Sequence, residues 1–460
     1  MINNICFPLS VRKEEESTYN GIDVIIQKLI KKEEIIMKIL FLEAEESYYM
    51  HMDTKIPKRW AYLVEIATYV RNHGHDVKVM DCLDPKISHA EVITEVTNNH
   101  YDIICFLMRI ETYTSLRKLT KILKTISPDT KFISYGDAPA MFVNTIKETL
   151  PALDAVIESG DWEVAITNYA KYISGEAFQD KDVPGITIKE NGEWINARRC
   201  NGEQFNGWEF PDLDNPIANY DLYFSITKGQ LTFSVSRGCP YNCKFCLAVK
   251  TFDKDDRRKP PKDIVDYMIK NRDKVKSYKL FSPTFTYDEG WVTELCNELI
   301  TRKANVTWVC TSRPDRLKNE ELLKLMVKAG CTRIAVGIET LDETSNRELN
   351  KFANIEEYKD TLRKLFDVAN RIGLQIKPLL MLGIKGQTKE NINETLAFLK
   401  ECGVETLRMA AYSPRQDLTA ADNKNVLNVD TIEQYDKMTF INFLPDGMSE
   451  RDFLNYIYKM

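Results

Sequence analysis

The sequence predicts an α/β protein of two domains, a doubly wound parallel sheet followed by a partial (β/α)6 barrel. Short apolar runs alternate with amphipathic helical patterns over residues 37–173, and again, in longer units, over residues 231–415. Such alternation is typical of parallel sheets whose strands are joined by helices. Between the two series, residues 174–230 are rich in Gly, Asn, Asp and Pro, which predicts a linker.

The first series predicts five strands and the helices between them. The strands are KILFLEA (38–44), DVKVMD (76–81), DIICFLM (102–108), KFISYG (131–136) and DAVIESG (154–160). Apolar residues at helical spacing predict helices over 60–74, 89–100, 115–127 and 143–150. This pattern predicts a flavodoxin-like, Rossmann-type sheet, which binds its ligands at the carboxyl ends of the strands.

The second series predicts six strands, too few for the usual closed barrel of eight but enough for a partial, TIM-like one. The strands are LTFSVS (231–236), YKLFSPT (278–284), VTWVCTS (306–312), TRIAVGIET (332–340), QIKPLLMLG (375–383) and ETLRMAAYS (405–413). Helical patterns separate them, among them residues 290–303, 319–330 and 356–373. Ligand-binding residues of such a barrel are expected just after the strands.

The remaining segments are less regular. In the linker, Asn191-Gly192 within GITIKENGEWINA predicts a β-hairpin. Residues 416–460 predict a tail that ends in two short amphipathic helices. Two interpretations stay open for residues 1–36: a leader translated upstream of a natural start at Met37, or a docking helix over DVIIQKLIKK.

Composition excludes several classes of partner. The 460 residues are 43% hydrophobic and 28% charged, as in globular proteins, with 62 Lys and Arg against 68 Asp and Glu. The net charge of −6 gives no basic footprint for nucleic acid or anionic membranes. No run approaches the ~18 apolar residues of a membrane span, and the first 20 residues lack the apolar core of a secretory signal. We expect a cytoplasmic protein with neither partner.

Three cysteines lie close together in SRGCPYNCKFC, at Cys239, Cys243 and Cys246. Thiolates are ligands for zinc and for iron–sulfur clusters. A structural zinc site needs a fourth ligand, for which His100 and Cys331 are conceivable, and would indicate a zinc-stabilised binding module. On a cubane cluster, three thiolates instead leave one iron open for a substrate or cofactor. Both interpretations stay open on the spacing alone.

With Ser236-Arg237-Gly238 before them and a partial barrel after them, these cysteines resemble the radical S-adenosylmethionine (SAM) superfamily. Phe245 matches the aromatic residue that the family usually has before its last cysteine. The resemblance implies a [4Fe–4S] cluster on Cys239, Cys243 and Cys246. It also implies that the open iron chelates SAM and that reductive cleavage of SAM yields a 5′-deoxyadenosyl radical.

Further segments resemble the family's SAM-binding elements in the expected order. They imply contacts with SAM from seven residues: Phe245, Ser282, Thr284, Arg313, Glu339, Thr340 and Gly383. Ser282-Pro283-Thr284 departs from the Gly-Gly-Glu of many members, so hydroxyls and carbonyls would replace a carboxylate there. Arg313 and Arg237 are equally consistent with structural ion pairs. Cys310 and Tyr412 are candidate catalytic residues that would donate hydrogen or touch substrate, with barrel filling as the alternative.

The amino-terminal domain resembles that of the cobalamin-binding subgroup of radical SAM enzymes. SYGDAPAMF and IESGDWE stand where the subgroup has glycine-rich turns, which implies cobalamin contacts at Gly136, Asp137, Gly160 and Glu163. His51 lacks the surrounding motif of a cobalt ligand, as in many members of the subgroup. The alternative is a degenerate domain retained for structure.

The resemblance implies cobalamin-dependent methylation of an unactivated carbon of a small metabolite. A cyclisation, rearrangement or oxidation without methyl transfer is the alternative within the family. Either reaction needs an external one-electron donor, which we expect to be of the flavodoxin or ferredoxin type. A small-molecule substrate is the default, because no peptide-binding or lipid-binding module is recognisable in the sequence.

Overall fold

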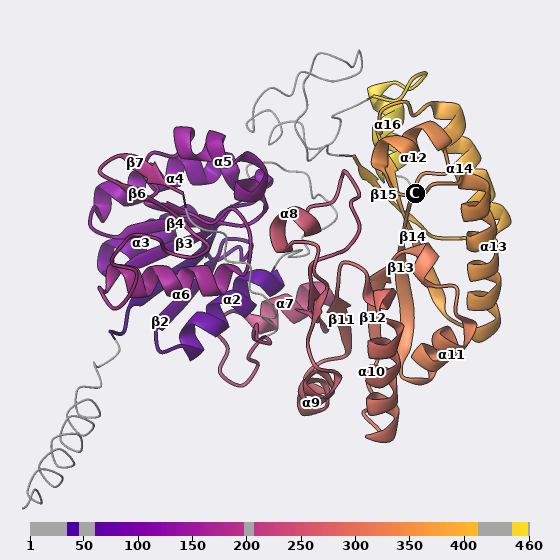
Figure 1. The fold of residues 1–460 in the computed structure, drawn as a ribbon, viewed down its shortest axis with the longest axis horizontal. Coiled ribbons are helices and arrows are strands. Elements are labelled where there is room, and N and C mark those ends of the chain that lie inside the picture. Colours follow the sequence, from indigo (N-terminus) through magenta and orange to yellow (C-terminus); the bar gives the residue numbers. More distant parts are fainter. Residues whose placement is uncertain (1–34, 46–59, 197–206, 413–443, 459–460) are drawn as a thin grey trace, which may run out of the picture. The chain divides into compact units, whose positions relative to one another are not determined.

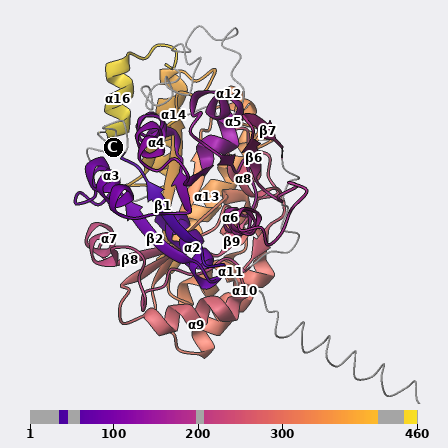
Figure 2. The same ribbon diagram turned by 90° about the vertical axis from the view of Figure 1, so that its left-hand side faces the viewer.

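The first sheet has seven strands in the order β2-β1-β3-β4-β5-β6-β7 (Figures 1 and 2). The computed structural model describes residues 35–45, 60–196, 207–412 and 444–458. The strands are β1 (Lys38–Glu43), β2 (Asp76–Asp81), β3 (Ile103–Leu107), β4 (Lys131–Tyr135), β5 (Ala155–Val156), β6 (Thr187–Glu190) and β7 (Glu193–Ile195). The first five are parallel and match the five predicted runs.

The predicted hairpin at Asn191-Gly192 is confirmed, but it is part of the sheet. Strand β6 pairs antiparallel with β5 on one side and with β7 on the other. Asn191 and Gly192 both have positive φ, at 50° and 87°, as a two-residue hairpin turn requires. The segment expected to be a linker therefore extends the first sheet by two strands.

Alternation along the strands gives the first sheet two cores. Ile39 and Phe41 of β1 pack on one face, and Leu40 and Leu42 pack on the other. Helices α2 (Trp60–Asn72) and α6 (Trp162–Ile173) cover the first face. Helices α3 (His89–Asn98), α4 (Tyr113–Ile126) and α5 (Asp137–Thr149) cover the second. The sheet is doubly wound, as predicted, although the sequence analysis did not identify α6.

The second sheet is a curled, wholly parallel sheet of six strands in the order β15-β14-β13-β12-β11-β8. Its strands are β8 (Gln230–Ser234), β11 (Ser277–Phe281), β12 (Trp308–Ser312), β13 (Cys331–Glu339), β14 (Gln375–Leu382) and β15 (Arg408–Ala411). The first and last strands of this order are not paired with each other. The predicted partial barrel is therefore confirmed.

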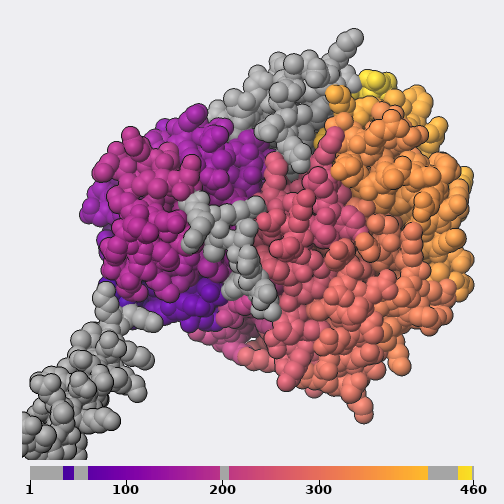
Figure 3. Space-filling model, viewed as in Figure 1, coloured from indigo at the N-terminus to yellow at the C-terminus, as the bar shows by residue number. Residues whose placement is uncertain are grey.

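Helices pack on the outer face of this half-barrel. They are α9 (Pro261–Asn271), α10 (Glu289–Thr301), α11 (Glu320–Lys328), α13 (Ile355–Ile372) and α14 (Lys389–Glu401), with the shorter α12 (Glu343–Leu349) near the strand ends. In the space-filling view, this part of the chain, pink to orange, forms a continuous outer surface (Figure 3). Helix α13 illustrates why they form: Asn354 caps its first turn through Glu357 N, and Gly373, at φ 71°, ends it.

Residues 37–460 form one compact unit, and the core that includes α2 and α6 continues into the half-barrel. Helix α2 packs on β8, where Ser234 N donates to the buried Glu65 carboxylate at 2.7 Å. Helix α7 (Tyr220–Thr227) precedes β8, and α16 (Glu450–Tyr458) packs on β15. Of the predicted tail, residues 416–443 lie outside the described residues, as does His51.

Candidate functional site

The three cysteines lie on the loop that follows β8, at the carboxyl end of the half-barrel. A two-residue ribbon opens the loop, in which β9 (Ser236–Arg237) pairs with β10 (Arg257–Arg258). Gly238 has φ 82°, and a Cβ there would lie 1.9 Å from Asp255 O, so no other residue fits. Cys239 N then donates to Asp253 O at 3.1 Å. These backbone contacts explain why Arg-Gly-Cys occurs at this turn.

The loop encloses the thiols without removing all of them from solvent. Cys239 and Cys243 are 6% and 9% exposed, and Cys246 is half-buried. In the described ranges, no three His, Cys, Asp or Glu side chains converge on a point that would hold a single metal ion. An iron–sulfur cluster takes one thiolate on each of three irons, so its ligands do not have to converge. Soft donors on one short loop fit such a cluster.

Arg313, just after β12, donates a hydrogen bond to one of these thiols. Its Nη1 donates to Cys243 Sγ at 3.3 Å, and its Nη2 donates to Lys351 O at 3.0 Å. The guanidinium stacks on Tyr241, with its Cζ 3.9 Å from the ring centroid. Burial raises the pKa of Cys243, while Lys351 and Arg313 act in the opposite direction. Arg313 therefore favours the thiolate form that a metal ligand needs.

Two hydroxyls after β11 lie next to the cysteine loop. Ser282 accepts from Ser236 Oγ at 2.6 Å, and Thr284 Oγ1 is 3.7 Å from Cys239 Sγ. Both Ser282 and Thr284 are buried. Arg258 holds this segment by donating to Thr284 O at 3.1 Å. The predicted SAM-binding residues of this strand are thus brought to the cysteines.

Glu339 ends β13 in a strained backbone conformation, at φ 65°. The register with β14 shifts between Gly337 and Glu339, and Lys351 Nζ binds Glu339 Oε1 at 2.6 Å. A Cβ on Gly337 would lie 2.5 Å from that oxygen, so glycine admits the ion pair. Strain of this kind is common where a side chain is aimed at a ligand. Thr340, the next residue, is buried and accepts from Asp342 N.

An apolar cluster includes a residue of the cysteine loop. Phe245 and Tyr412 pack with Leu349 and Ile384. Gly383, beside Ile384, has φ 88°, and its N donates to Gln387 Oε1 at 2.7 Å. Phe245, Gly383 and the candidate Tyr412 are therefore in or next to this cluster. An apolar wall with an aromatic edge suits a purine base.

Cys310 does not reach this site. It lies in register with Leu280 and Ile334, whose side chains pack under the outer helices. The Cys310 side chain is 2% exposed, and burial raises its pKa far above the usual range. The strand position of Cys310 favours the barrel-filling alternative, and a substrate contact of Cys310 stays a prediction.

Arg237 forms a buried ion cluster with the loop that follows β5. Its Nη1 binds Asp161 Oδ1 at 3.0 Å and Glu163 Oε1 at 2.7 Å, and all three side chains are fully buried. Arg257 binds the second oxygen of Asp161 at 2.7 Å. Burial raises the pKa of Glu163, against the pull of Arg237. For Arg237 the structural ion pair is what the structure shows.

This ion cluster changes the interpretation of the two residues predicted at the second cobalamin turn. Glu163 is occupied by Arg237, and Gly160 N donates to Thr251 O at 2.7 Å, on the helix after the cysteines. Both therefore contact the segment that carries the cysteines, and their predicted cobalamin contacts stay a prediction. The sequence shows the carboxylates of Asp161 and Glu163 in this turn, but it does not show that Arg237 pairs with them.

Gly136 and Asp137 remain at the carboxyl edge of the first sheet. Gly136 has φ 120° and lies so close to β3 that a Cβ would be 2.5 Å from Met108 O. Asp137 begins α5 and is 6% exposed. Ser134, two residues earlier, has a buried hydroxyl without a hydrogen-bond partner among the described residues. A polar ligand at this edge would satisfy that hydroxyl.

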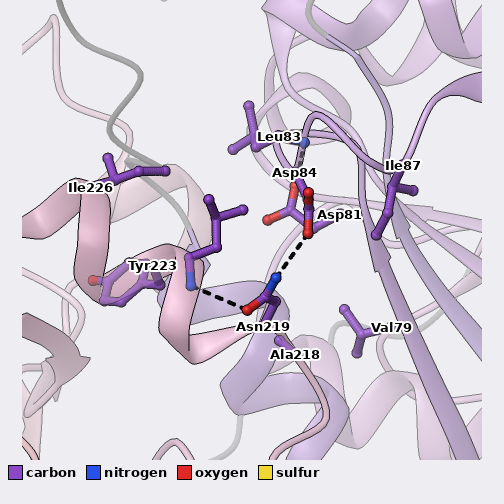
Figure 4. A pocket seen from close by; sticks show the side chains of 10 residues that line it. Val79, Asp81, Leu83, Asp84, Ile87, Ala218, Asn219, Tyr223 and Ile226 are labelled. Atoms are coloured by element: carbon purple, nitrogen blue, oxygen red, sulfur yellow. Dashed lines mark hydrogen bonds between the residues drawn. The ribbon is translucent and has the colours of Figure 1, made fainter.

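A second polar group lies where β2 ends. Asp81 lines a cavity of only about 40 Å³, beside Asp84, whose carboxylate accepts from Asn219 Nδ2 at 3.0 Å (Figure 4). This volume admits water but no cofactor. Burial and the neighbouring Glu43 raise the pKa of Asp81 to about 8. The cavity lies between α7 and the first sheet, and it is too small to bind a cofactor.

Lys351 is the main residue that the sequence analysis did not identify. It binds Glu339 and Gly337 O, and its carbonyl accepts from Arg313. It lies in the turn after α12, where no spacing or motif distinguishes it from a solvent-exposed lysine.

Residues 233–399 match the family model of the radical SAM superfamily. The chain is 26% identical over 440 residues to the anaerobic magnesium-protoporphyrin IX monomethyl ester cyclase of Rubrivivax gelatinosus, covering 92% of this chain and 76% of the relative. It is 23% identical to an uncharacterized methyltransferase of Pyrococcus horikoshii, covering 82% and 81%.

Among solved structures, the fold is similar to the radical SAM methyltransferase TsrM of Kitasatospora setae, a structure with cobalamin and a [4Fe–4S] cluster bound. The TM-score is 0.68 at 13% identity, covering 83% of this chain and 77% of TsrM. Separately, none of the helices described here has the length and apolar character needed to cross a membrane.

Proposed function

We propose that the chain is a radical SAM enzyme that methylates an unactivated carbon of a small metabolite in a cobalamin-dependent reaction. The match of residues 233–399 to the superfamily's model supports the first part of this proposal. When bound, the cluster supplies the electron that cleaves SAM, and cobalamin carries the methyl group. Similarity to TsrM and to a named methyltransferase supports this proposal.

The observation that carries the proposal is the joint between the carboxyl edges of the two sheets. The loop after β5 and the loop after β8 both follow parallel strands, where such sheets bind ligands. Arg237, Asp161 and Glu163 join these loops through ion pairs that are closed to solvent. These ion pairs hold the two ligand-binding edges in a fixed position relative to each other. This arrangement favours reaction between a group bound at one edge and a group bound at the other.

The side chains around the cysteines have separate tasks in this proposal. Cys239, Cys243 and Cys246 hold the cluster, and Arg313 stabilises its thiolates. Hydroxyls of Ser282 and Thr284 hydrogen-bond the polar end of SAM, and Glu339, held by Lys351, accepts from ribose hydroxyls. The apolar set of Phe245, Ile384 and Tyr412 packs on the adenine and excludes water.

Cyclisation is the second candidate, because the cyclase relative matches 92% of this chain. In either reaction, an external one-electron donor reduces the cluster, and we propose a flavodoxin or ferredoxin. The two candidates differ in what becomes of the SAM methyl group. Methylation consumes one SAM as methyl donor, which yields S-adenosylhomocysteine, and another as radical source, which yields 5′-deoxyadenosine. Cyclisation yields 5′-deoxyadenosine without S-adenosylhomocysteine.

Product analysis with methyl-deuterated SAM tests the proposal. Anaerobic protein reconstituted with iron, sulfide and hydroxocobalamin is incubated with a reductant, and products are identified by mass spectrometry. We expect S-adenosylhomocysteine, 5′-deoxyadenosine and, with a competent substrate, a trideuterated methyl group in the product. If 5′-deoxyadenosine forms without S-adenosylhomocysteine under the same conditions, methylation is wrong and the second candidate replaces it.

A further inference from the structure

Four basic side chains lie on the inner face of the half-barrel, toward the amino ends of its strands. They are Lys279 on β11, Arg333 on β13, Lys377 on β14 and Arg408 on β15. We call them the lumen cations. They interrupt strands whose alternate residues, such as Leu280 and Ile334, are buried under the outer helices. Lys279, Arg333 and Lys377 are half-buried and Arg408 is exposed, so the three half-buried charges favour a partner of opposite charge.

Strand register places these cations on one face. Lys279 is opposite Val309, which is opposite Arg333. Two residues after Arg333, Ala335 is opposite Lys377 of β14. Two residues after Lys377, Leu379 is opposite Arg408 of β15. Residues opposite each other, or two apart, point to the same face of a sheet. The four side chains thus project into the same space.

That space is a cavity of about 470 Å³. Its other polar lining comes from Gln230, Thr232 and Thr311 on the strands and from Thr227 and Lys228 at the end of α7. No Asp or Glu stands among the described residues that line it. The volume is within the range of small-molecule sites.

The lumen cations repel each other and find no carboxylate in the described part of the chain. Burial, and then the charges of Arg408, Arg333 and Lys377, lower the pKa of Lys279. Burial and the two arginines lower the pKa of Lys377 in the same way. By contrast, the buried Arg237 is paired with Glu163, and Lys351 is paired with Glu339. An anion in the cavity would relieve the repulsion.

The cavity and the cysteine loop lie at opposite ends of the same strands. Lys279 is three residues before Ser282, and Arg333 is six residues before Glu339. At about 3.3 Å per strand residue, these separations are roughly 10 Å and 20 Å. A ligand of that length, held by its charged end at the cations, would extend to the edge where the cysteines lie.

From these observations we infer that the half-barrel binds a substrate with at least two negative charges, carried by carboxylate or phosphate groups, at the lumen cations. Arginine recognises both groups with paired N–H donors, and lysine adds point charges. The substrate's uncharged end then lies toward Ser282 and Glu339. The assignment of this anion as substrate rests on the proposed function, but the binding site itself does not.

Calorimetric titration of the iron-loaded full chain tests the inference. The probes are inorganic pyrophosphate and the tricarboxylate tricarballylate, each in low-salt chloride buffer, with iron content measured before and after. We expect the wild-type chain to bind at least one probe. The probe that binds with the higher affinity identifies phosphate or carboxylate as the preferred group. Lys279→Gln/Arg333→Gln should weaken binding of that probe by at least about tenfold, or about 1.4 kcal/mol, because two cations that face the anion are removed.

A control of equal charge is Lys262→Gln/Lys328→Gln, at two exposed lysines on α9 and α11. This control should bind the probe like the wild type. If the double lumen variant loses its iron through misfolding, the exposed Arg408→Gln replaces it, with a smaller weakening expected. The inference is wrong if neither probe binds the wild type, or if a folded lumen variant binds as tightly as the control.

Formation of 5′-deoxyadenosine by the wild type separates this inference from the proposed function. Intact SAM cleavage without anion binding contradicts only the inference. Anion binding without any SAM cleavage contradicts only the proposed function.

Discussion

At the scale of single residues, the site depends on side chains that hold other side chains. Arg313 contacts Cys243 directly, and Lys351 holds both Glu339 and the backbone of the strand that carries it. The ion pair between Glu339 and Lys351 forms where Glu339 has a positive φ and where Gly337 has no side chain to clash with it. A motif search finds the residues that meet the cofactor, but these supporting contacts become visible only with the fold.

The contact between Arg313 and Cys243 predicts a shift in the cluster's reduction potential. A hydrogen bond to a ligating sulfur stabilises the more negative, reduced state. If Arg313→Met removes about 1 kcal/mol of that preference, the potential falls by about 40 mV for one electron. Redox titration followed by electron paramagnetic resonance measures it. Arg316→Met, which removes a charge that contacts Tyr241 and Tyr287, is the matched control. Equal shifts in both variants would mean that general charge, not this hydrogen bond, sets the potential.

Asp81 predicts a dependence of stability on pH. Burial and Glu43 raise its pKa from 3.8 to about 8, so native Asp81 holds a proton that the unfolded chain releases. Between about pH 4 and 8, the free energy of unfolding should therefore fall as pH rises, by up to about 1.4 kcal/mol per unit for this group. Glu65, with a pKa raised to about 7 chiefly by burial, adds to the same trend.

Denaturant unfolding at several pH values measures this dependence, and Asp81→Asn should flatten it. Because the amide does not titrate, only the contribution of Glu65 and other groups should remain. An unchanged pH profile in Asp81→Asn would show that Asp81 is ionised in the native protein.

At the scale of elements, the ion cluster of Arg237 joins two loops that are far apart in the sequence. Arg237→Met would leave the Asp161 and Glu163 carboxylates enclosed without their main partner, although Arg257 still reaches Asp161. Removing one member of a buried ion pair costs about 3–5 kcal/mol. We expect a loss of this order in chemical denaturation of the full chain.

A triple variant controls for the lost packing of Arg237 on Trp208 and Phe252. Adding Asp161→Asn and Glu163→Gln to Arg237→Met removes the unpaired charges, so it should recover part of the stability. A loss below about 1 kcal/mol in the single variant would mean that water or another cation reaches these carboxylates.

The elements themselves were largely predictable, because each strand is a short apolar run between turn residues. All eleven predicted strands are present, and the outer helices follow their apolar periodicity. The hairpin at Asn191-Gly192 was predictable from its turn, but its pairing with β5 was not, since pairing depends on distant strands. Cys310 shows the same limit: alternation groups it with Leu280 and Ile334 but does not say which face of the strand is the lumen.

At the scale of the whole molecule, the alternation of apolar runs predicted two sheets, and family resemblance predicted the role of the cysteines. Neither predicted the contacts between the two sheets' loops, in which Glu163 binds Arg237 and Gly160 N donates to Thr251 O. The lumen cations had a sequence signal: Lys279, Arg333, Lys377 and Arg408 each fall within an apolar strand run. A charge in such a run is a candidate for a ligand contact once the fold is known.

In the proposed function, one chain holds both a cluster and cobalamin at the joined sheet edges. Its most direct test is metal analysis of the full chain after anaerobic reconstitution with iron, sulfide and hydroxocobalamin, followed by desalting. The account predicts about four irons per chain, as for one [4Fe–4S] cluster, together with about one cobalt. The triple Cys→Ala variant at 239, 243 and 246 should lose the iron and keep the cobalt. Iron without retained cobalt in the wild type, or undiminished iron in the triple variant, would contradict the account.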